Sequence, residues 1–447
     1  MDRIEERIVS TIEEHGEEIK EIGRRIFACP ELGYKEFKTS AFFSDFMGEM
    51  GIKTQKGLAI TGAKGYLKGG KEGPAIALVG ELDALPIADS PYSNPDTGAA
   101  HCCGHNAQMA AMMGAAFGLC LPEVREAMAG TVVFFAVPAE EFVEVEFKHT
   151  LMEQGAIAYG GGKSELIRIG AFDDIHIAVG HHVCEGADIR IMNNPSNGFL
   201  NKIVHFQGKA SHAAESPHRG VDALNAASLT IQALNMQQET YRDRDSVRVH
   251  GFISRGGESM NVVADHTTME YSVRANNIPA IENASEKFDR SVRAGAMATG
   301  CGARIITMPG YLPTVPVSDL TTLLEAAHQA TGRHQIMPVN PSYIQGGSTD
   351  FGDVSQILPL LQFHTGGYGG ALHDKALHPV DEDTAYVLPA KIFALTAYNL
   401  LKNQAANART LMDGFKPSLT KEEYIRYMDD HNQVEEIPPT RLKHPLE

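Results

Sequence analysis

The sequence predicts an α/β fold of two domains: a larger domain with a mostly parallel central sheet, and a second domain inserted into it. Continuous apolar runs predict the strands of the parallel sheet, because such strands are covered by helices on both faces. Alternating runs separated by helical segments predict the inserted domain. The chain has 447 residues, which is long enough for two or more domains.

The larger domain is predicted to begin with an amphipathic helix over residues 3–28, where isoleucines recur at helical spacing. Three apolar runs then predict parallel strands at residues 75–79, 131–137 and 175–179. Residues 107–121 are small and apolar, and they predict a buried helix between the first two strands. This order of strands and helices is typical of an α/β sheet.

The pattern changes between about residues 194 and 309. Alternation and apolar periodicity predict, in order, a strand at 202–207, a helix at 220–239, strands at 246–254 and 264–274, a helix at 279–297 and a strand at 303–308. The order βαββαβ is that of a ferredoxin-like unit. We therefore predict that residues 195–309 are inserted between two segments of the larger domain, 1–194 and 310–447, the second ending in a polar tail.

Composition and charge narrow the class of protein. The net charge is −17, so neither nucleic acid nor an anionic membrane is expected as the main partner. No apolar run approaches the length of a transmembrane helix, and the acidic N-terminus has no apolar signal core. The six cysteines are sparse, and the adjacent Cys102 and Cys103 make a poor disulfide pair. We therefore expect a cytoplasmic protein.

Residue types that bind metals concentrate just after the predicted parallel strands. Cys103 and His105 lie two residues apart in a loop, Glu140 and Glu141 follow the second apolar run, and His182 follows the third. Open α/β sheets place their active sites at the carboxyl ends of their strands. An isolated Cys-x-His pair is more often structural, but the added glutamates and histidine favour a metal site. The pattern predicts a metal-dependent hydrolase in which one glutamate binds metal and the other moves protons.

Several further candidates are left open by spacing alone. Either His373 or His378 could complete the ligand set. In the inserted domain His212, Asn261 and Arg274 are candidates for contact with substrate, and the Arg274 guanidinium suits a carboxylate. A surface position on a strand explains Arg274 equally well.

Together these motifs resemble those of the aminoacylase/carboxypeptidase-like amidohydrolases, in particular the branch of indole-acetyl-amino-acid, hippurate and aminobenzoyl-glutamate hydrolases. The resemblance covers about residues 20–400. Its landmarks are Pro-Glu-Leu-Gly-Tyr-Lys-Glu at 30–36, Glu-Leu-Asp-Ala-Leu-Pro at 81–86, Cys-Gly-His-Asn at 103–106, Pro-Ala-Glu-Glu at 138–141, His-Val at 182–183, Gly-Lys-Ala-Ser-His at 208–212, Asn-Val-Val at 261–263 and Ser-Thr-Asp-Phe at 348–351.

The resemblance implies a zinc-exopeptidase-like catalytic domain, with the inserted domain as lid and dimerisation surface. It implies that two divalent ions are held by Cys103, His105, Glu141, His182 and His373. Cysteine and histidine suit Zn, and the same ligands could also hold Mn, Co or Ni. His373 is preferred because residues 372–375 look like the family's Leu-His segment before its last helix. The remaining roles implied are a general base for Glu140, a ligand-orienting carboxylate for Asp83, contact with the partner subunit's site for His212, and substrate contacts for Asn261 and Arg274.

The chain also departs from the family pattern. Asn106 and Gln108 stand where many relatives have Asp and His, and residues 142–147 replace a glycine-rich stretch after the glutamate pair. The resemblance implies that these positions line or support the substrate end of the site. The identity of the substrate is therefore left open.

We predict hydrolysis of the amide of an N-acyl- or N-aroyl-amino acid, such as an aminobenzoyl-glutamate-like compound, through a metal-bridging hydroxide with Glu140 as general base, in a homodimer. One alternative is a dipeptidase or carboxypeptidase on the same scaffold, which is distinguished by whether the substrate needs a free α-amino group. The other is a non-catalytic metal or redox protein that uses Cys102 and Cys103, which would bind metal without cleaving any acyl-amino acid.

Overall fold

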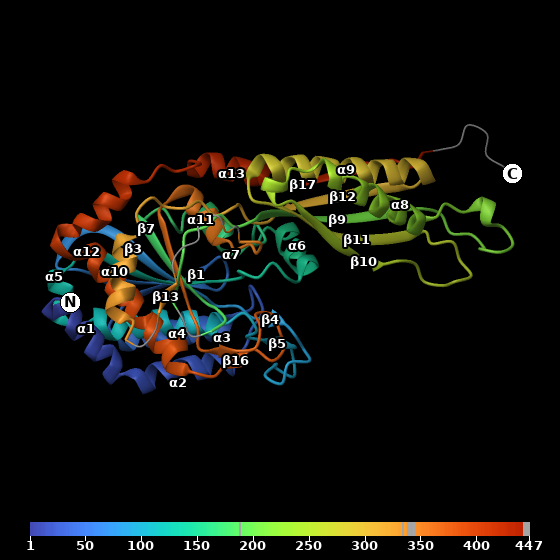
Figure 1. The fold of residues 1–447 in the computed structure, drawn as a ribbon. Helices are drawn as coiled ribbons and strands as arrows, with labels where there is room; N and C mark the ends of the chain where they lie inside the picture. Colours follow the sequence, from blue (N-terminus) through green and yellow to red (C-terminus); the bar gives the residue numbers. More distant parts are fainter. Residues whose placement is uncertain (187–188, 333–334, 338–342, 344, 441–447) are drawn as a thin grey trace. The chain divides into compact units, whose positions relative to one another are not determined.

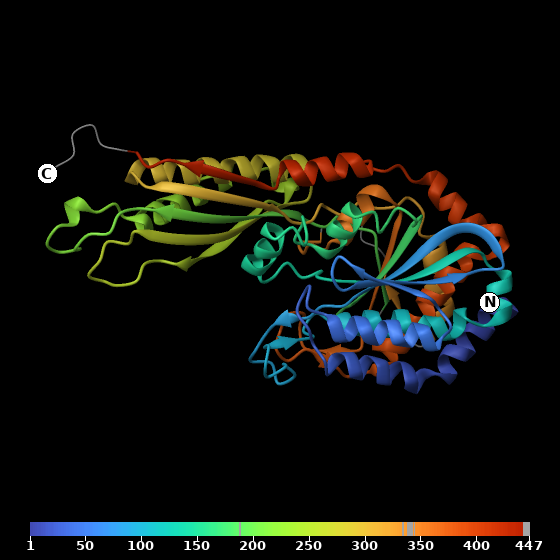
Figure 2. The same ribbon diagram turned by 180° about the vertical axis from the view of Figure 1, so that it is seen from behind.

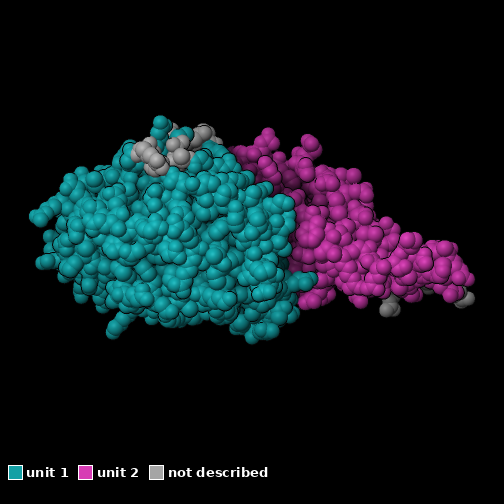
Figure 3. Space-filling view, turned by 90° about the horizontal axis from the view of Figure 1, so that it is seen from below, with its two compact units in different colours: residues 1–194, 315–343, 353–421 teal, residues 195–314, 344–352, 422–447 magenta. Residues whose placement is uncertain are grey.

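The protein divides into two compact units, which are described here one at a time. The computed structural model describes residues 1–186, 189–332, 335–337, 343 and 345–440. Unit 1 comprises residues 1–194, 315–343 and 353–421, and unit 2 comprises residues 195–314, 344–352 and 422–447 (Figure 3).

Unit 1 is built on an eight-stranded sheet with the strand order β1-β2-β6-β3-β7-β14-β8-β13 (Figure 1). The central strands β6, β3, β7 and β14 run parallel to one another. The strands are β1 Thr54–Leu58, β2 Gly62–Lys68, β3 Lys71–Glu81, β6 Ala129–Val137, β7 Ile177–Val183, β8 Ile189–Met192, β13 Ile336–Met337 and β14 Leu360–Thr365. The predicted α/β fold class with a mostly parallel central sheet is confirmed.

The helices outside the inserted segment are α1 Arg3–Glu14, α2 Gly16–Phe27, α3 Phe37–Glu49, α4 His105–Leu119, α5 Pro122–Ala127, α6 Val145–Glu153, α7 Gly162–Arg168, α10 Thr321–Ala330, α11 Phe351–Ile357, α12 Leu388–Gly414 and α13 Lys421–Asp430. Two short ladders pair β4 (Leu85–Pro86) with β5 (Ala99–Ala100) and β15 (Tyr368–Gly369) with β16 (His378–Pro379). The prediction of a single helix over residues 3–28 is wrong, because the segment forms two helices. The chain leaves the helical conformation at His15, which separates α1 from α2.

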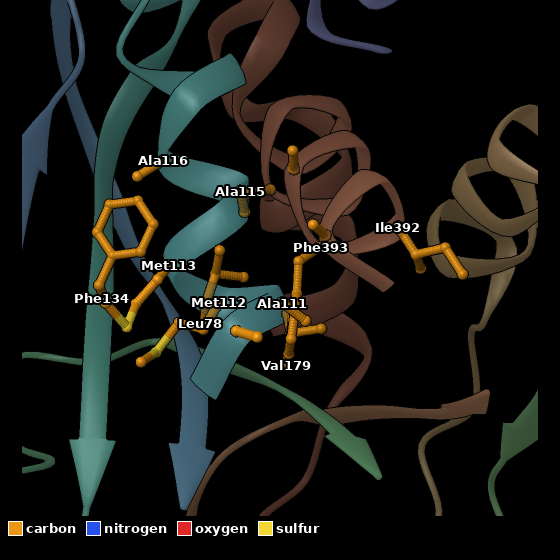
Figure 4. Packing of buried hydrophobic residues seen from close by; sticks show 14 of the residues in the cluster. Leu78, Ala111, Met112, Met113, Ala115, Ala116, Phe134, Val179, Ile392 and Phe393 are labelled. Carbon is orange, nitrogen blue, oxygen red and sulfur yellow. The ribbon is translucent and has the colours of Figure 1, made fainter. Parts of the chain in front are cut away.

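The core of unit 1 lies between one face of the sheet and the helices α4 and α12 (Figure 4). Leu78 on β3, Phe134 on β6 and Val179 on β7 are fully buried beneath Met112 of α4 and Phe393 of α12. Because α4 is apolar on all sides, it is enclosed by protein rather than lying at the surface. This packing fixes α4 and therefore the position of its first residue, which belongs to the site described below.

Unit 2 contains a five-stranded antiparallel sheet with the order β10-β11-β9-β12-β17. Its elements are β9 Gly198–Gln207, α8 Ala223–Met236, β10 Arg248–Arg255, β11 His266–Ala275, α9 Ile278–Thr299, β12 Gly302–Pro309 and β17 Gln433–Ile437. The helices α8 and α9 cover one face of the sheet (Figures 1 and 2). The chain order from β9 to β12 is the βαββαβ order that the sequence predicts.

The C-terminal segment differs from the sequence-based assignment. Residues 422–447 belong to unit 2, whereas the sequence placed all of 310–447 in the larger domain. The physical reason is a ladder between β17 and β12, in which Ala303 pairs with Ile437 and Thr307 with Gln433. Arg293 on α9 and Glu435 on β17 reinforce it with a bidentate ion pair.

No helix among the described residues is long and apolar enough to cross a membrane.

Candidate metal centre

Polar side chains gather at the carboxyl ends of β3, β6 and β7 in unit 1. Glu81 ends β3, Glu140 and Glu141 follow β6, and His182 is the penultimate residue of β7. His105 is the first residue of α4. Because the three strands are parallel and adjacent, their carboxyl ends meet at one edge of the sheet. This is the edge at which the sequence predicted an active site.

Three groups of side chains offer ligand atoms that lie within 4.8 Å of one another. The groups are Cys103 with His105 and His182, Cys103 with Glu141 and His373, and Glu81 with His105 and Glu140. The first two share Cys103, so its sulfur is placed between two potential cation positions. All five residues that the sequence nominated as metal ligands are therefore brought together within unit 1.

The two buried histidines present the same nitrogen to the cluster. His105 Nδ1 lies 2.9 Å from the carbonyl oxygen of Asp83, and His182 Nδ1 lies 2.9 Å from that of Val183. A carbonyl oxygen only accepts hydrogen bonds, so each Nδ1 carries a proton, and Nε2 is the ring nitrogen that can bind a metal ion. His182 Nε2 lies 3.2 Å from Cys103 Sγ. Backbone carbonyls thus orient both imidazoles for metal binding through Nε2.

Buried polar atoms without hydrogen bonds show that the residues fit a bound cation. His105 Nε2, Asp83 Oδ1 and Glu141 Oε1 are buried and have no hydrogen-bond partner within the described part of the chain. Such atoms are rare in folded proteins because each costs free energy. Thiol, imidazole and carboxylate together are a donor set for a divalent transition metal. All six cysteines are free, so Cys103 is not tied up in a disulfide bond.

Burial shapes the ionisation of the cluster. Burial, together with the charge of Glu141, raises the pKa of the Cys103 thiol well above its ordinary value. A bound metal ion reverses this tendency because a coordinating thiol is deprotonated. The ionisation of these buried side chains is therefore more favourable in a protein with metal bound than in a metal-free protein.

Asp83 links two of the candidate ligands. Its Oδ2 accepts a hydrogen bond of 2.9 Å from the backbone N–H of Glu141, and its Oδ1 lies 3.2 Å from His105 Nδ1. Burial opposes the ionisation of Asp83, but the neighbouring His105 ring, the Glu141 N–H and the charge of Lys148 together lower its pKa. Asp83 is thus placed to orient ligands, as expected for a carboxylate behind a metal site.

Glu81 belongs to the cluster although sequence reasoning gave it no role. Its Oε2 lies 3.1 Å from His105 Nε2. Lys163 Nζ donates to Oε1 at 2.6 Å, and Gln108 Nε2 donates to Oε2 at 2.6 Å. The signal in the sequence was a charged residue at the end of a buried apolar strand, two positions before Asp83.

The backbone adopts unusual conformations at two points of the centre. Gly104 has φ +82°, and a Cβ there would lie 2.4 Å from Cγ2 of Val183. His373 also has a positive φ, +66°, and its N–H donates to the carbonyl of Cys102 at 2.7 Å. Glycine adopts a positive φ readily, whereas at His373 such a conformation persists only where the surroundings enforce it.

Of the two alternatives for the last ligand, His373 lies in the cluster. Its Nε2 is 3.4 Å from Glu141 Oε1, although its side chain is 56% exposed. His378 belongs to none of the groups found among the described residues. Its Nδ1 instead bonds the carbonyl of Ala376 at 2.8 Å.

The three candidates for substrate contact all lie in unit 2. The exposed His212 and Asn261 are neighbours, because the N–H of Ala213 donates to the carbonyl of Asn261 at 2.9 Å. Arg274 is half-buried on β11. Its guanidinium lies 4.8 Å from the centre of the Phe199 ring, and Nη1 donates to Ser348 Oγ at 3.2 Å. It is therefore not a plain surface residue.

The chain is similar to known proteins in both sequence and fold. The profile of peptidase family M20/M25/M40 matches residues 77–398. An Xaa-Arg dipeptidase of Mus musculus is 27% identical over 94% of this chain and 91% of its own length. An N-acetyl-L-cysteine deacetylase of Bacillus subtilis is 29% identical over 72% and 74%. A crystal structure of a dinuclear metal-binding peptidase from Bacillus subtilis aligns with a TM-score of 0.63 at 23% identity, over 87% and 99%.

Proposed function

Because the chain belongs to peptidase family M20/M25/M40, metal-dependent hydrolases of amide and peptide bonds, we propose that it cleaves the amide of an N-acyl- or N-aroyl-amino acid with Glu140 as general base. The observation that carries the proposal is the position of Glu140. Its Oε2 lies 3.8 Å from His105 Nε2, and the next residue, Glu141, belongs to the ligand cluster. One carboxylate is thereby placed to bind metal, and its neighbour lies beside the same cluster, where a group for proton transfer is required.

The residues proposed to hold two divalent ions are Cys103, His105, Glu141, His182 and His373. When bound, the ions supply Lewis acidity, which activates water and polarises the substrate carbonyl. Glu140 accepts a proton from the attacking water as its oxygen bonds to the amide carbon. As the carbon–nitrogen bond breaks, Glu140 returns the proton to the departing amine. Asp83 keeps His105 and the Glu141 backbone in place throughout.

Unit 2 is proposed to act as lid and dimerisation domain. Arg274 suits the carboxylate of the amino acid, with Asn261 as a further substrate contact. By the family resemblance, His212 would act in the site of a partner subunit and stabilise the developing oxyanion. The strand β10 is an edge of the sheet with Phe252 exposed, and such edges are available for pairing with another chain. Light scattering of the purified protein tests for the dimer.

The test of the mechanism is Glu140→Gln, which keeps the shape of the side chain and removes its basicity. We expect kcat to fall by about 10²–10⁴-fold, because general bases contribute that much. Metal content by elemental analysis should remain that of wild type. The matched control is Glu146→Gln, an exposed glutamate on α6. An active Glu140→Gln enzyme would show that another group is the base.

A dipeptidase is the second candidate, favoured by the Xaa-Arg dipeptidase relative that spans nearly the whole chain. The two candidates differ in whether the substrate needs a free α-amino group. Rates on alanyl-arginine and on N-acetyl-alanyl-arginine, beside N-acetyl-arginine, separate them. A strict requirement for the free amine selects the dipeptidase.

The cytoplasm is the proposed location. The six free cysteines fit a reducing compartment.

A further inference from the structure

A row of three side chains crosses the sheet of unit 1 beside the candidate metal centre. His364 on β14 is in register with His182 on the parallel β7, and Arg190 on β8 is directly opposite His364. Side chains paired in this way point to the same face of a sheet, and neighbouring strands are about 4.8 Å apart. The row therefore leads from a candidate metal ligand, through His364, to a guanidinium.

His364 is placed for binding a ligand rather than for packing. Its ring centre lies 5.5 Å from that of His182. The side chain is partly exposed, and no hydrogen bond of its ring is found within the described residues. It belongs to none of the potential metal groups there. An imidazole next to a candidate metal ligand is thus left with its hydrogen-bonding capacity available.

Arg190 is exposed, and only part of its hydrogen-bonding capacity is taken up within the described residues. Its Nη2 donates to the carbonyl of Glu185 at 3.1 Å, which holds the guanidinium at the sheet. A guanidinium has five N–H groups, so donors remain for a ligand.

We propose that His364 and Arg190 form a subsite for a carboxylate of the substrate that is several bonds away from the scissile amide. The position beside His182 is next to the reacting end of the substrate, whereas Arg190 is one strand farther away. A side-chain or acyl-chain carboxylate spans that separation better than the carboxylate attached directly to the amino acid's α-carbon. The inference rests on the proposed function, and it narrows the substrate class to N-acyl-amino acids that carry an extra acidic group.

The experiment compares matched acidic and neutral substrates with the metal-loaded full chain. N-acetyl-glutamate against N-acetyl-glutamine tests an acid on the amino-acid side. N-succinyl-alanine against N-butyryl-alanine tests an acid on the acyl side. We expect wild type to prefer the acidic member of one pair by about tenfold or more in kcat/KM, because hydrogen bonds to charged groups have that strength. The pair that shows the preference identifies the source of the carboxylate.

Variants then assign the preference to this subsite. Arg190→Gln should raise KM for the acidic substrate about tenfold and leave the neutral substrate unchanged. His364→Leu should act in the same direction, and His364→Gln, which can still donate, should recover part of the loss. Arg409→Gln, an exposed arginine on α12, is the control. Equal losses on both substrates, or no acidic preference in wild type, would overturn the subsite.

A binding measurement separates failure of the subsite from failure of the proposed function. Calorimetry with glutarate and with butyrate requires no turnover. Tighter binding of glutarate by wild type, lost in Arg190→Gln, supports the subsite even if no N-acyl-amino acid is cleaved. Equal binding of the two acids refutes it, whatever the enzyme hydrolyses.

Discussion

Two buried lysines, one in each unit of this protein, pair with carboxylates in similar ways. In unit 1, Lys163 Nζ donates to Glu81 at 2.6 Å, and both side chains are almost completely buried. In unit 2, Lys202 Nζ donates to Asp289 at 2.8 Å, again with the lysine almost completely buried. Each pair includes a third polar group: Gln108 donates to Glu81, and Thr307 accepts from Lys202.

The pairs differ in what lies beyond the carboxylate. Glu81 is 3.1 Å from His105 Nε2 and so couples its lysine to the candidate metal centre. Asp289 lies on α9 and Lys202 on β9, so that pair joins a helix to the sheet it covers. A buried charge therefore marks a constrained position without revealing why it is constrained. The neighbours of the pair distinguish a catalytic support from a packing contact.

Removal of each lysine should give the largest effect. Lys163→Met and Lys202→Met each leave a carboxylate without its partner, and we expect each to lower the free energy of unfolding by about 3–5 kcal/mol. Added divalent metal should reduce the loss in free energy of unfolding caused by Lys163→Met, because the cation offsets the negative charge of Glu81. The loss caused by Lys202→Met should not change. Urea denaturation with and without metal measures both, and an equal response to metal would remove the distinction.

Removal of the carboxylate charge should separate the pairs by metal affinity. We expect Glu81→Gln to weaken metal binding about 10–100-fold, as is usual for residues that support ligands. Asp289→Asn serves as the matched variant in unit 2, and its metal affinity should equal that of wild type. Competition with a chelator gives the affinities. If Glu81→Gln binds metal with wild-type affinity, the Lys163–Glu81 pair is structural, like the Lys202–Asp289 pair.

The smallest expected effect concerns a helix cap in unit 2. Asp222 caps α8 by accepting hydrogen bonds from the N–H groups of Leu224 and Asn225 at 2.9 and 3.1 Å. Asp222→Ala should lower the free energy of unfolding by about 1 kcal/mol, with no change in metal affinity. Asp222→Asn retains an acceptor and should stay close to wild type. Thermal denaturation of the three proteins tests the cap.

Much of the fold was predictable because it depends on local patterns. The apolar runs before Glu81, Glu140 and His182 predicted the parallel strands, and those strands placed the nominated ligands at one edge. The alternating segments predicted the βαββαβ order. In each case the side-chain period within one segment is enough to indicate the element.

The remaining features depend on contacts between distant segments. Lys163 lies 82 positions from Glu81, and nothing in the sequence near either residue indicates the other. The pairing of Glu81 with Lys163 could not be predicted for that reason. The strand β17 is short and polar, and it becomes a strand only by pairing with β12. The alignment of His182, His364 and Arg190 likewise depends on the register of β7, β14 and β8.

The ladder between β12 and β17 has a consequence for synthesis on the ribosome. The strand β12 ends at Pro309, whereas its partner β17 begins only at Gln433. While the intervening residues are translated, β12 is an open sheet edge, and such edges attract other strands. The nascent protein is therefore exposed to mispairing at this edge until β17 has been synthesised.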